Sequence, residues 1–109
     1  MRVEDDWESV VGLLSKGEIA LVKRWRCEGI EMPWGFGEEV LERVARLGST
    51  SGATFRALTR RNRMKLEEGD VAVVLSGPTG SEHAAIDDFY LVLVRGQRLC
   101  VHSRFLRRA

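Results

Sequence analysis

The last forty residues of the chain alternate between apolar runs and turn signals, and this pattern constrains the fold more than any other feature. Apolar residues fill positions 71–75 and 89–94, and a polar loop, residues 76–88, separates the two runs. Gly96 permits a tight turn, after which apolar and polar residues alternate from residue 99 to residue 108. The pattern predicts three antiparallel strands, an arrangement typical of a small β-barrel.

Two stretches in the first half of the chain have the pattern of helices. Apolar residues recur at i, i+3, i+4 and i+7 from Trp7 to Leu14, and this spacing predicts a helix over residues 6–14. Residues 38–47 carry an apolar stripe, two glutamates in the first turn and a glycine directly after the last residue. These features predict a second helix, with its charges placed favourably for the helix dipole.

Three other segments have weaker patterns. Residues 17–28 fit either a helix or a strand, and we expect a helix, with the strand as the alternative. Residues 53–58 are expected to form a short strand. Trp34 and Phe36 lie in an irregular stretch punctuated by proline and glycine, and we expect both rings to pack back onto the core. The other expected core residues are Val40, Val44, Leu47, Val71, Val73, Leu91, Leu93, Val101 and Phe105.

Length and composition indicate one compact unit, with a helical part over residues 1–50 and a β part over residues 51–109. The chain has 109 residues and is 44% hydrophobic, enough to bury a core without a metal or a disulfide. No apolar run approaches the roughly 20 residues that span a bilayer, and the acidic N-terminus is unlike a signal peptide. We therefore expect a cytoplasmic protein, or a virion component, in which Cys27 and Cys100 are reduced thiols.

Charge is unevenly distributed along the chain. Residues 1–50 carry seven Lys/Arg and ten Asp/Glu, a net −3, whereas residues 51–109 carry ten and six, a net +4. Most of the excess lies in two basic segments, which would form one cationic surface if the last strand lay beside residues 56–65. The candidate residues for binding phosphate, nucleic acid or an acidic protein are Arg56, Arg60, Arg61, Arg63, Lys65, Arg104 and Arg107.

The loop 76–88 is longer than a hairpin needs, and long loops on rigid scaffolds commonly bind partners. The candidate partner-binding residues are Thr79, His83, Asp87, Asp88 and Tyr90. The same loop holds Ser81, His83 and Asp87, a serine, a histidine and an acid, but no motif sets them on a scaffold. We therefore expect no catalytic residues. The spacing of cysteine and histidine likewise gives no metal site, and nothing in the sequence implies a cofactor.

A resemblance covers residues 69–107. The apolar strand 69–74, the tyrosine-led strand 90–94, the turn at Gly96 and the segment Val101–Leu106 resemble SH3-type small barrels of bacterial and phage proteins. The resemblance implies a scaffold that binds proteins, peptides, nucleic acid or cell-wall polymers without a shared active site. We accordingly expect an α+β fold, with N-terminal helices packed on a small antiparallel SH3-like sheet or partial barrel.

The expected function is a non-enzymatic protein-interaction or assembly module, an adaptor of phage type. It would dock another protein through the 76–88 loop and the basic surface. The alternative is a nucleic-acid-binding protein that uses its arginine-rich segments, for which affinity would fall steeply with salt.

Overall fold

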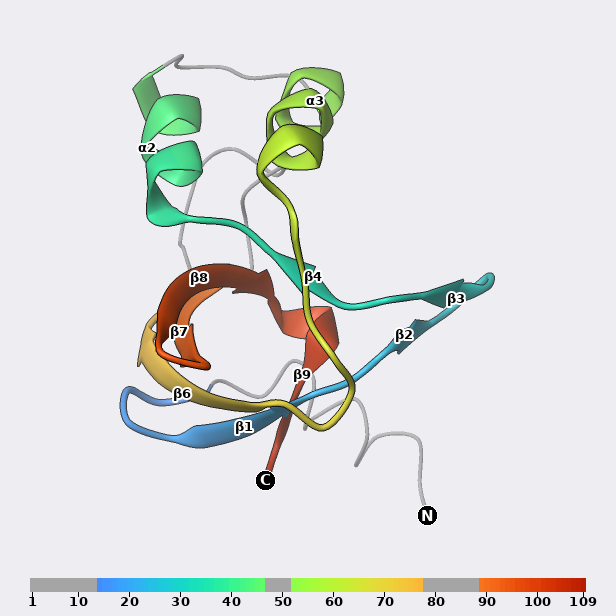
Figure 1. Cartoon of the computed structure of the whole chain (residues 1–109), viewed down its shortest axis with the longest axis vertical. Helices are drawn as coiled ribbons and strands as arrows, with labels where there is room; N and C mark the ends of the chain where they lie inside the picture. Colours follow the sequence, from blue (N-terminus) through green and yellow to red (C-terminus); the bar gives the residue numbers. More distant parts are fainter. Residues whose placement is uncertain (1–13, 47–51, 78–88) are drawn as a thin grey trace.

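The computed structural model describes residues 14–46, 52–77 and 89–109, and its centre is one curved antiparallel sheet (Figure 1). The strands lie in the order β8-β7-β6-β1-β9, so the last strand in the chain pairs with the first. The sheet curls into a partial barrel that has β8 and β9 at its two edges (Figure 1). The five strands are β1 (Ile19–Val22), β6 (Val71–Ser76), β7 (Phe89–Val94), β8 (Gln97–His102) and β9 (Leu106–Arg108).

Strand β1 is central because it has a partner on each side. Ala20 is in register with Ala72 of β6 and with Arg108 of β9. A single turn of 3-10 helix, η2 (Ser103–Phe105), lies between β8 and β9 and redirects the chain toward β1. The side chain of His102 caps this turn, since its Nδ1 accepts a hydrogen bond from the Arg104 N–H at 3.0 Å.

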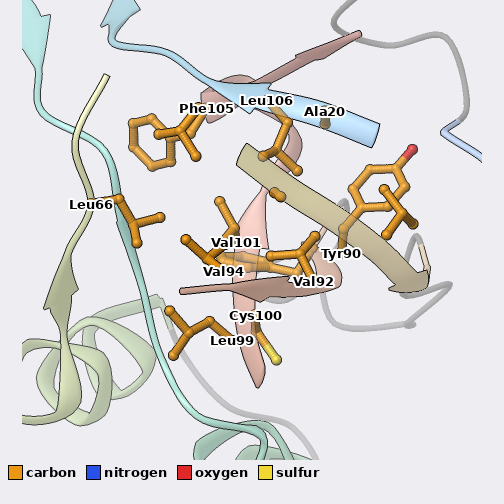
Figure 2. Packing of buried hydrophobic residues seen from close by; sticks show 14 of the residues in the cluster. Ala20, Leu66, Tyr90, Val92, Val94, Leu99, Cys100, Val101, Phe105 and Leu106 are labelled. Carbon is orange, nitrogen blue, oxygen red and sulfur yellow. The ribbon is translucent and has the colours of Figure 1, made fainter. Parts of the chain in front are cut away.

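Buried side chains of β6 and β7 fill much of the interior, and Figure 2 shows Tyr90, Val92 and Val94 of β7 among them. The buried residues in these strands are Ala72, Val74, Phe89, Tyr90, Val92 and Val94. The expectation that Val71 and Leu93 belong to the core is therefore wrong, because they are 55% and 36% exposed. Both faces of these strands are apolar, so the sequence does not indicate which face points into the core. The pairing register with the neighbouring strands determines the inward face.

Val73 and Leu91, also expected in the core, are half-buried, whereas Val40, Val101 and Phe105 are buried as expected.

A long insertion between β1 and β6 contains both α-helices and four two-residue strands. Its elements are β2 (Trp25–Arg26), β3 (Ile30–Glu31), β4 (Trp34–Gly35), α2 (Glu38–Arg46), α3 (Gly52–Asn62) and β5 (Met64–Lys65). Figure 1 shows the two helices side by side above the barrel.

The expected α+β arrangement, with N-terminal helices packed on the sheet, is wrong. The described chain is mostly β. Its two short helices lie between β1 and β6 in the chain, and not before the first strand of the sheet. Residues 17–28 contain β1 and β2 instead of a helix, because their apolar residues alternate for a sheet. Residues 53–58 belong to helix α3, not to a strand. The helix expected over residues 38–47 is confirmed as α2.

Strand β4 fastens the insertion to the barrel. The residue that follows it, Phe36, exchanges two backbone hydrogen bonds with Cys100 of β8, at 3.0 and 2.6 Å. A Cβ on Gly35 would come within 2.9 Å of Val101 Cγ2 and 3.0 Å of the Cys100 carbonyl oxygen. Only glycine allows this approach, which carries Trp34 and Phe36 into the core as expected.

The helix expected over residues 6–14 lies outside the described residues except for Leu14. Leu14 is buried, and its N–H donates to the Tyr90 hydroxyl at 3.1 Å. The glycine expected to end the second helix and most of the 76–88 loop also lie outside the described residues. Within the described ranges, no helix is both long and apolar enough to cross a bilayer.

The inward face of β6 can be tested with two substitutions of the same kind. Val74→Ala removes methyl groups from a side chain that is 1% exposed, and we expect it to lower the free energy of unfolding by about 2 kcal/mol. Val71→Ala, in the same strand, should cost less than about 1 kcal/mol. Urea denaturation measures both, and a larger loss for Val71→Ala would show that the strand faces the other way.

Candidate functional site

A groove lies between the β2–β3 hairpin and the 3-10 turn η2, and we call it the hairpin groove. The hairpin pairs Trp25 with Glu31 and Arg26 with Ile30, and residues 27–29 form its tip. The groove is shallow and open to solvent, with a volume of about 360 Å³. It is lined by Trp25, Cys27, Glu28, Gly29, Ile30 and Glu31 of the hairpin and by Arg104 of η2.

One ion pair connects the two walls of the hairpin groove. Arg104 Nη2 of η2 lies 2.8 Å from Glu31 Oε1 of β3. The two side chains are 30% and 41% exposed, so this pair contributes at most about 1 kcal/mol to stability. Its main effect is positional, because it holds the hairpin at a fixed distance from the barrel.

A cluster of four aromatic rings packs beneath this region: Trp34, Phe36, Phe89 and Phe105. Neighbouring ring centroids are 5.2–6.4 Å apart, the range of favourable edge and tilted contacts. Two guanidinium groups lie on the cluster, Arg63 at 4.0 Å from the Trp34 centroid and Arg104 at 5.1 Å from the Phe105 centroid. The rings therefore fix both arginines as well as the core.

The hairpin carries unusually exposed apolar side chains. Ile30 is 63% exposed and Met32, just after β3, is 56% exposed, while Trp25 is half-buried and packs against the core. Exposed apolar groups gathered at a groove commonly mark an interaction site. The arrangement can hold an apolar segment, with charged groups of both signs at its margin.

Most of the residues expected in the 76–88 loop site lie outside the described residues: Thr79, His83, Asp87 and Asp88. So do the serine, histidine and acid of the set Ser81, His83 and Asp87. Tyr90 is described, and it is 2% exposed. Because its hydroxyl accepts the Leu14 N–H and its ring fills the barrel, Tyr90 belongs to the core and not to a binding surface.

The basic residues do not form one surface. Arg56, Arg60 and Arg61 lie on α3, above the barrel in Figure 1, whereas Arg107 lies on β9 at the other side. Arg63 and Lys65 follow α3 directly, and Arg63 stacks on Trp34. Arg104 is held at the hairpin groove by Glu31. Arg104 and Arg107 therefore lie apart from the three arginines of α3.

Sequence reasoning missed the groove residues Trp25, Ile30 and Glu31. The signal that could have identified them is the alternation of apolar residues across 19–27, which fits the strand alternative for residues 17–28. Read as a strand pair with Gly29 near its turn, the segment would have predicted a hairpin with a tryptophan on one face.

The two cysteines have opposite environments. Cys27 is exposed at the groove and Cys100 is buried in β8, and both are free thiols. Burial raises the pKa of the Cys100 thiol to about 12, and the charges of Glu38 and Glu39 add to the effect. Within the part of the chain that the structure describes, no group of three His, Cys, Asp or Glu side chains could hold a metal ion.

Thiol labelling distinguishes these environments. In the folded protein at pH 8 we expect one thiol, Cys27, to react rapidly with a disulfide reagent, because Cys100 is buried and protonated. Both thiols should react in denaturant, and Cys27→Ser should remove the fast phase. Two fast thiols in the native protein would contradict the buried position of Cys100.

The raised pKa of Cys100 also makes the stability of the protein depend on pH. The folded state holds the thiol proton more tightly than the unfolded state, whose thiol has the ordinary pKa of 9.0. The free energy of unfolding therefore keeps the full contribution of the protonated Cys100 below pH 9 and loses it as the pH rises above 9.

Comparisons of the chain with protein-family models, with curated proteins and with solved structures find no match. What the protein does is therefore inferred from its own residues. Two features of the described residues are candidate binding sites: the hairpin groove with its exposed apolar side chains, and the arginines of α3.

Proposed function

We propose that the protein is a non-enzymatic protein-interaction module that docks a partner in the hairpin groove. The observation that carries this proposal is the combination of an open groove of about 360 Å³, lined in part by the 63% exposed Ile30, with a second exposed apolar residue, Met32, two positions further along the chain. Exposing both costs free energy that a bound partner would recover by burying them.

The scaffold supports a binding role. The curled sheet, in which the last strand pairs with the first after a turn of 3-10 helix, supports the resemblance to SH3-type small barrels. In such a barrel the core holds the sheet rigid, and segments outside the core can be presented to a partner without loss of stability. The β2–β3 hairpin is a segment of this kind, since only its base is joined to the barrel.

The groove also has the residue types that interfaces use. Trp25 presents a half-buried ring, and tryptophan and arginine are enriched among the residues that carry most of the binding energy. Arg104 offers guanidinium donors at the groove margin while its position is fixed by Glu31 and Phe105. A partner would place an apolar side chain against Trp25 and Ile30 and a polar group near Arg104.

The experiment presents the purified protein with a displayed library of random twelve-residue peptides and measures the affinity of enriched peptides by fluorescence polarisation. We expect Ile30→Asp to weaken binding at least tenfold, because a carboxylate at the groove opposes burial of an apolar segment. Val71→Asp is the matched control. Like Ile30, Val71 is an exposed β-branched apolar residue, 55% exposed, but it lies in β6 outside the groove.

Retained binding in Val71→Asp together with loss in Ile30→Asp would support the hairpin groove as the docking site. Equal loss in both variants would show that the effect comes from charge or stability, and the groove would be abandoned. Failure to enrich any peptide whose binding depends on Ile30 would contradict the proposal as well.

A further inference from the structure

The arginines of the described chain divide into two groups. Those on the barrel and hairpin are mostly held in ion pairs: Arg24 with Glu68, Arg95 with Asp70, Arg98 with Glu38, Arg104 with Glu31 and Arg108 with Glu18, at 2.7–3.1 Å. The three arginines of α3, Arg56, Arg60 and Arg61, are exposed, and within the described ranges none of them makes an ion pair. The positive charge of α3 is thus left for solvent or for a partner.

The helix concentrates this charge on one side. Thr59 of α3 is 1% exposed and marks the side that faces the protein. With about 100° between successive residues, Arg56, Arg60 and Arg61 fall within an arc of about 140° that begins about 60° from Thr59. No acidic residue occurs in the eleven residues of the helix. This arc of α3 therefore carries three exposed guanidinium groups and no carboxylate.

Stabilisation of the helix explains only part of this arrangement. Arg60 and Arg61 lie in the last turn of α3, where cations interact favourably with the helix dipole. Arg56 lies too early in the helix for that effect. It is one turn from Arg60, so the two like charges repel each other, which is unfavourable in the isolated helix. A bound anion would offset the repulsion between Arg56 and Arg60.

Within the described ranges, the acids of the neighbouring helix make no ion pair with the arginines of α3. The helix packed beside α3, α2, carries Glu38, Glu39 and Glu42. Glu38 is engaged by Arg98, and within the described residues neither of the other two makes an ion pair with α3. Beyond the helix the positive character continues, because Arg63 and Lys65 are both exposed.

Arg63 adds an element that favours one class of anion. Its guanidinium lies 4.0 Å from the Trp34 ring centroid, while Arg63 as a residue is exposed. One flat face of the guanidinium is therefore fixed on a ring, and the other is turned to solvent beside the α3 arginines. Unpaired nucleotide bases stack on guanidinium planes, and every nucleotide of a single strand brings such a base, whereas the carboxylates of an acidic peptide do not stack.

We propose that the solvent face of α3 binds the phosphate backbone of a single-stranded nucleic acid, with Arg63 stacking on a base. Arg56 and Arg60 are one turn apart, about 6 Å along the helix axis, a spacing that allows each guanidinium to engage a separate phosphate. Arg56, Arg60 and Arg61 do not line the hairpin groove. Arg63 of this surface and Arg104 of the groove lie on neighbouring rings of the aromatic cluster. The proposal does not depend on the function proposed for the groove.

The test measures the affinity for a fluorescently labelled twenty-nucleotide oligo-dT by anisotropy over a series of salt concentrations. We expect the triple variant R56A/R60A/R61A to weaken binding at least tenfold at low salt. The slope of log affinity against log salt should decrease by about 2, since each lost phosphate contact on a single strand contributes about 0.7. Arg63→Lys keeps the charge but removes the planar group, and we expect it to reduce affinity without changing the slope.

A matched control separates a specific surface from net charge. K16A/R26A/R107A also removes three exposed cations, none of which makes an ion pair within the described ranges, and it should change affinity less than threefold. Circular dichroism melting checks that both triple variants remain folded. Equal losses in the two triple variants, or no salt-dependent binding by the wild-type protein, would overturn the proposal. So would a labelled poly-glutamate peptide that binds as tightly as oligo-dT, because the surface would then suit an acidic protein.

Discussion

Strand β1 makes hydrogen bonds to both sides, and the rest of the structure depends on this. The Val22 N–H donates to the Asp70 carbonyl at 2.9 Å, next to β6, and the following Lys23 N–H donates to the Phe105 carbonyl at 2.7 Å, at the end of η2. Two consecutive amides thus join the segment before β6 to the segment before β9. Because these strands are distant in sequence, β1 acquires both neighbours only when the whole chain is in place.

The packed interior of the partial barrel leaves no room for a ligand. It is occupied by apolar side chains from the sheet, with Tyr90 and Phe105 filling two of its largest positions (Figure 2). The two surfaces for which we propose partners lie instead in the insertion between β1 and β6, which is held by the Phe36–Cys100 bridge and by the aromatic cluster. The hairpin groove and α3 both belong to this insertion, on a scaffold that need not change shape when either is used.

The sequence predicted the strands around residues 71–76 and 89–94 and the helix at 38–46 because each has a strong local pattern. Local pattern failed where tertiary pairing decides. Val71 and Leu93 lie in runs that are apolar at every position, so the sequence pattern does not show which side chains face the core. The register with β1 and β8 places these two on the outer face. Residues 17–28 have helical and strand periodicity together, and the strand is favoured by β6 and β9, which are remote in sequence. The groove was missed for the same reason: Arg104 meets Glu31 only in the folded chain.

Hydrogen exchange measured by NMR at Val22 and Lys23 tests the two-sided bonding of the β1 segment most directly. If both neighbours hold this segment in one cooperative unit, the two neighbouring amides exchange only through global unfolding, so both should report the same free energy of opening. Amides in α2 and α3, which lie outside the sheet, should exchange at lower free energies. A slow Val22 amide beside a fast Lys23 amide would contradict the account, because it would mean that the segment at Phe105 separates from the end of β1 while the β6 side stays bonded.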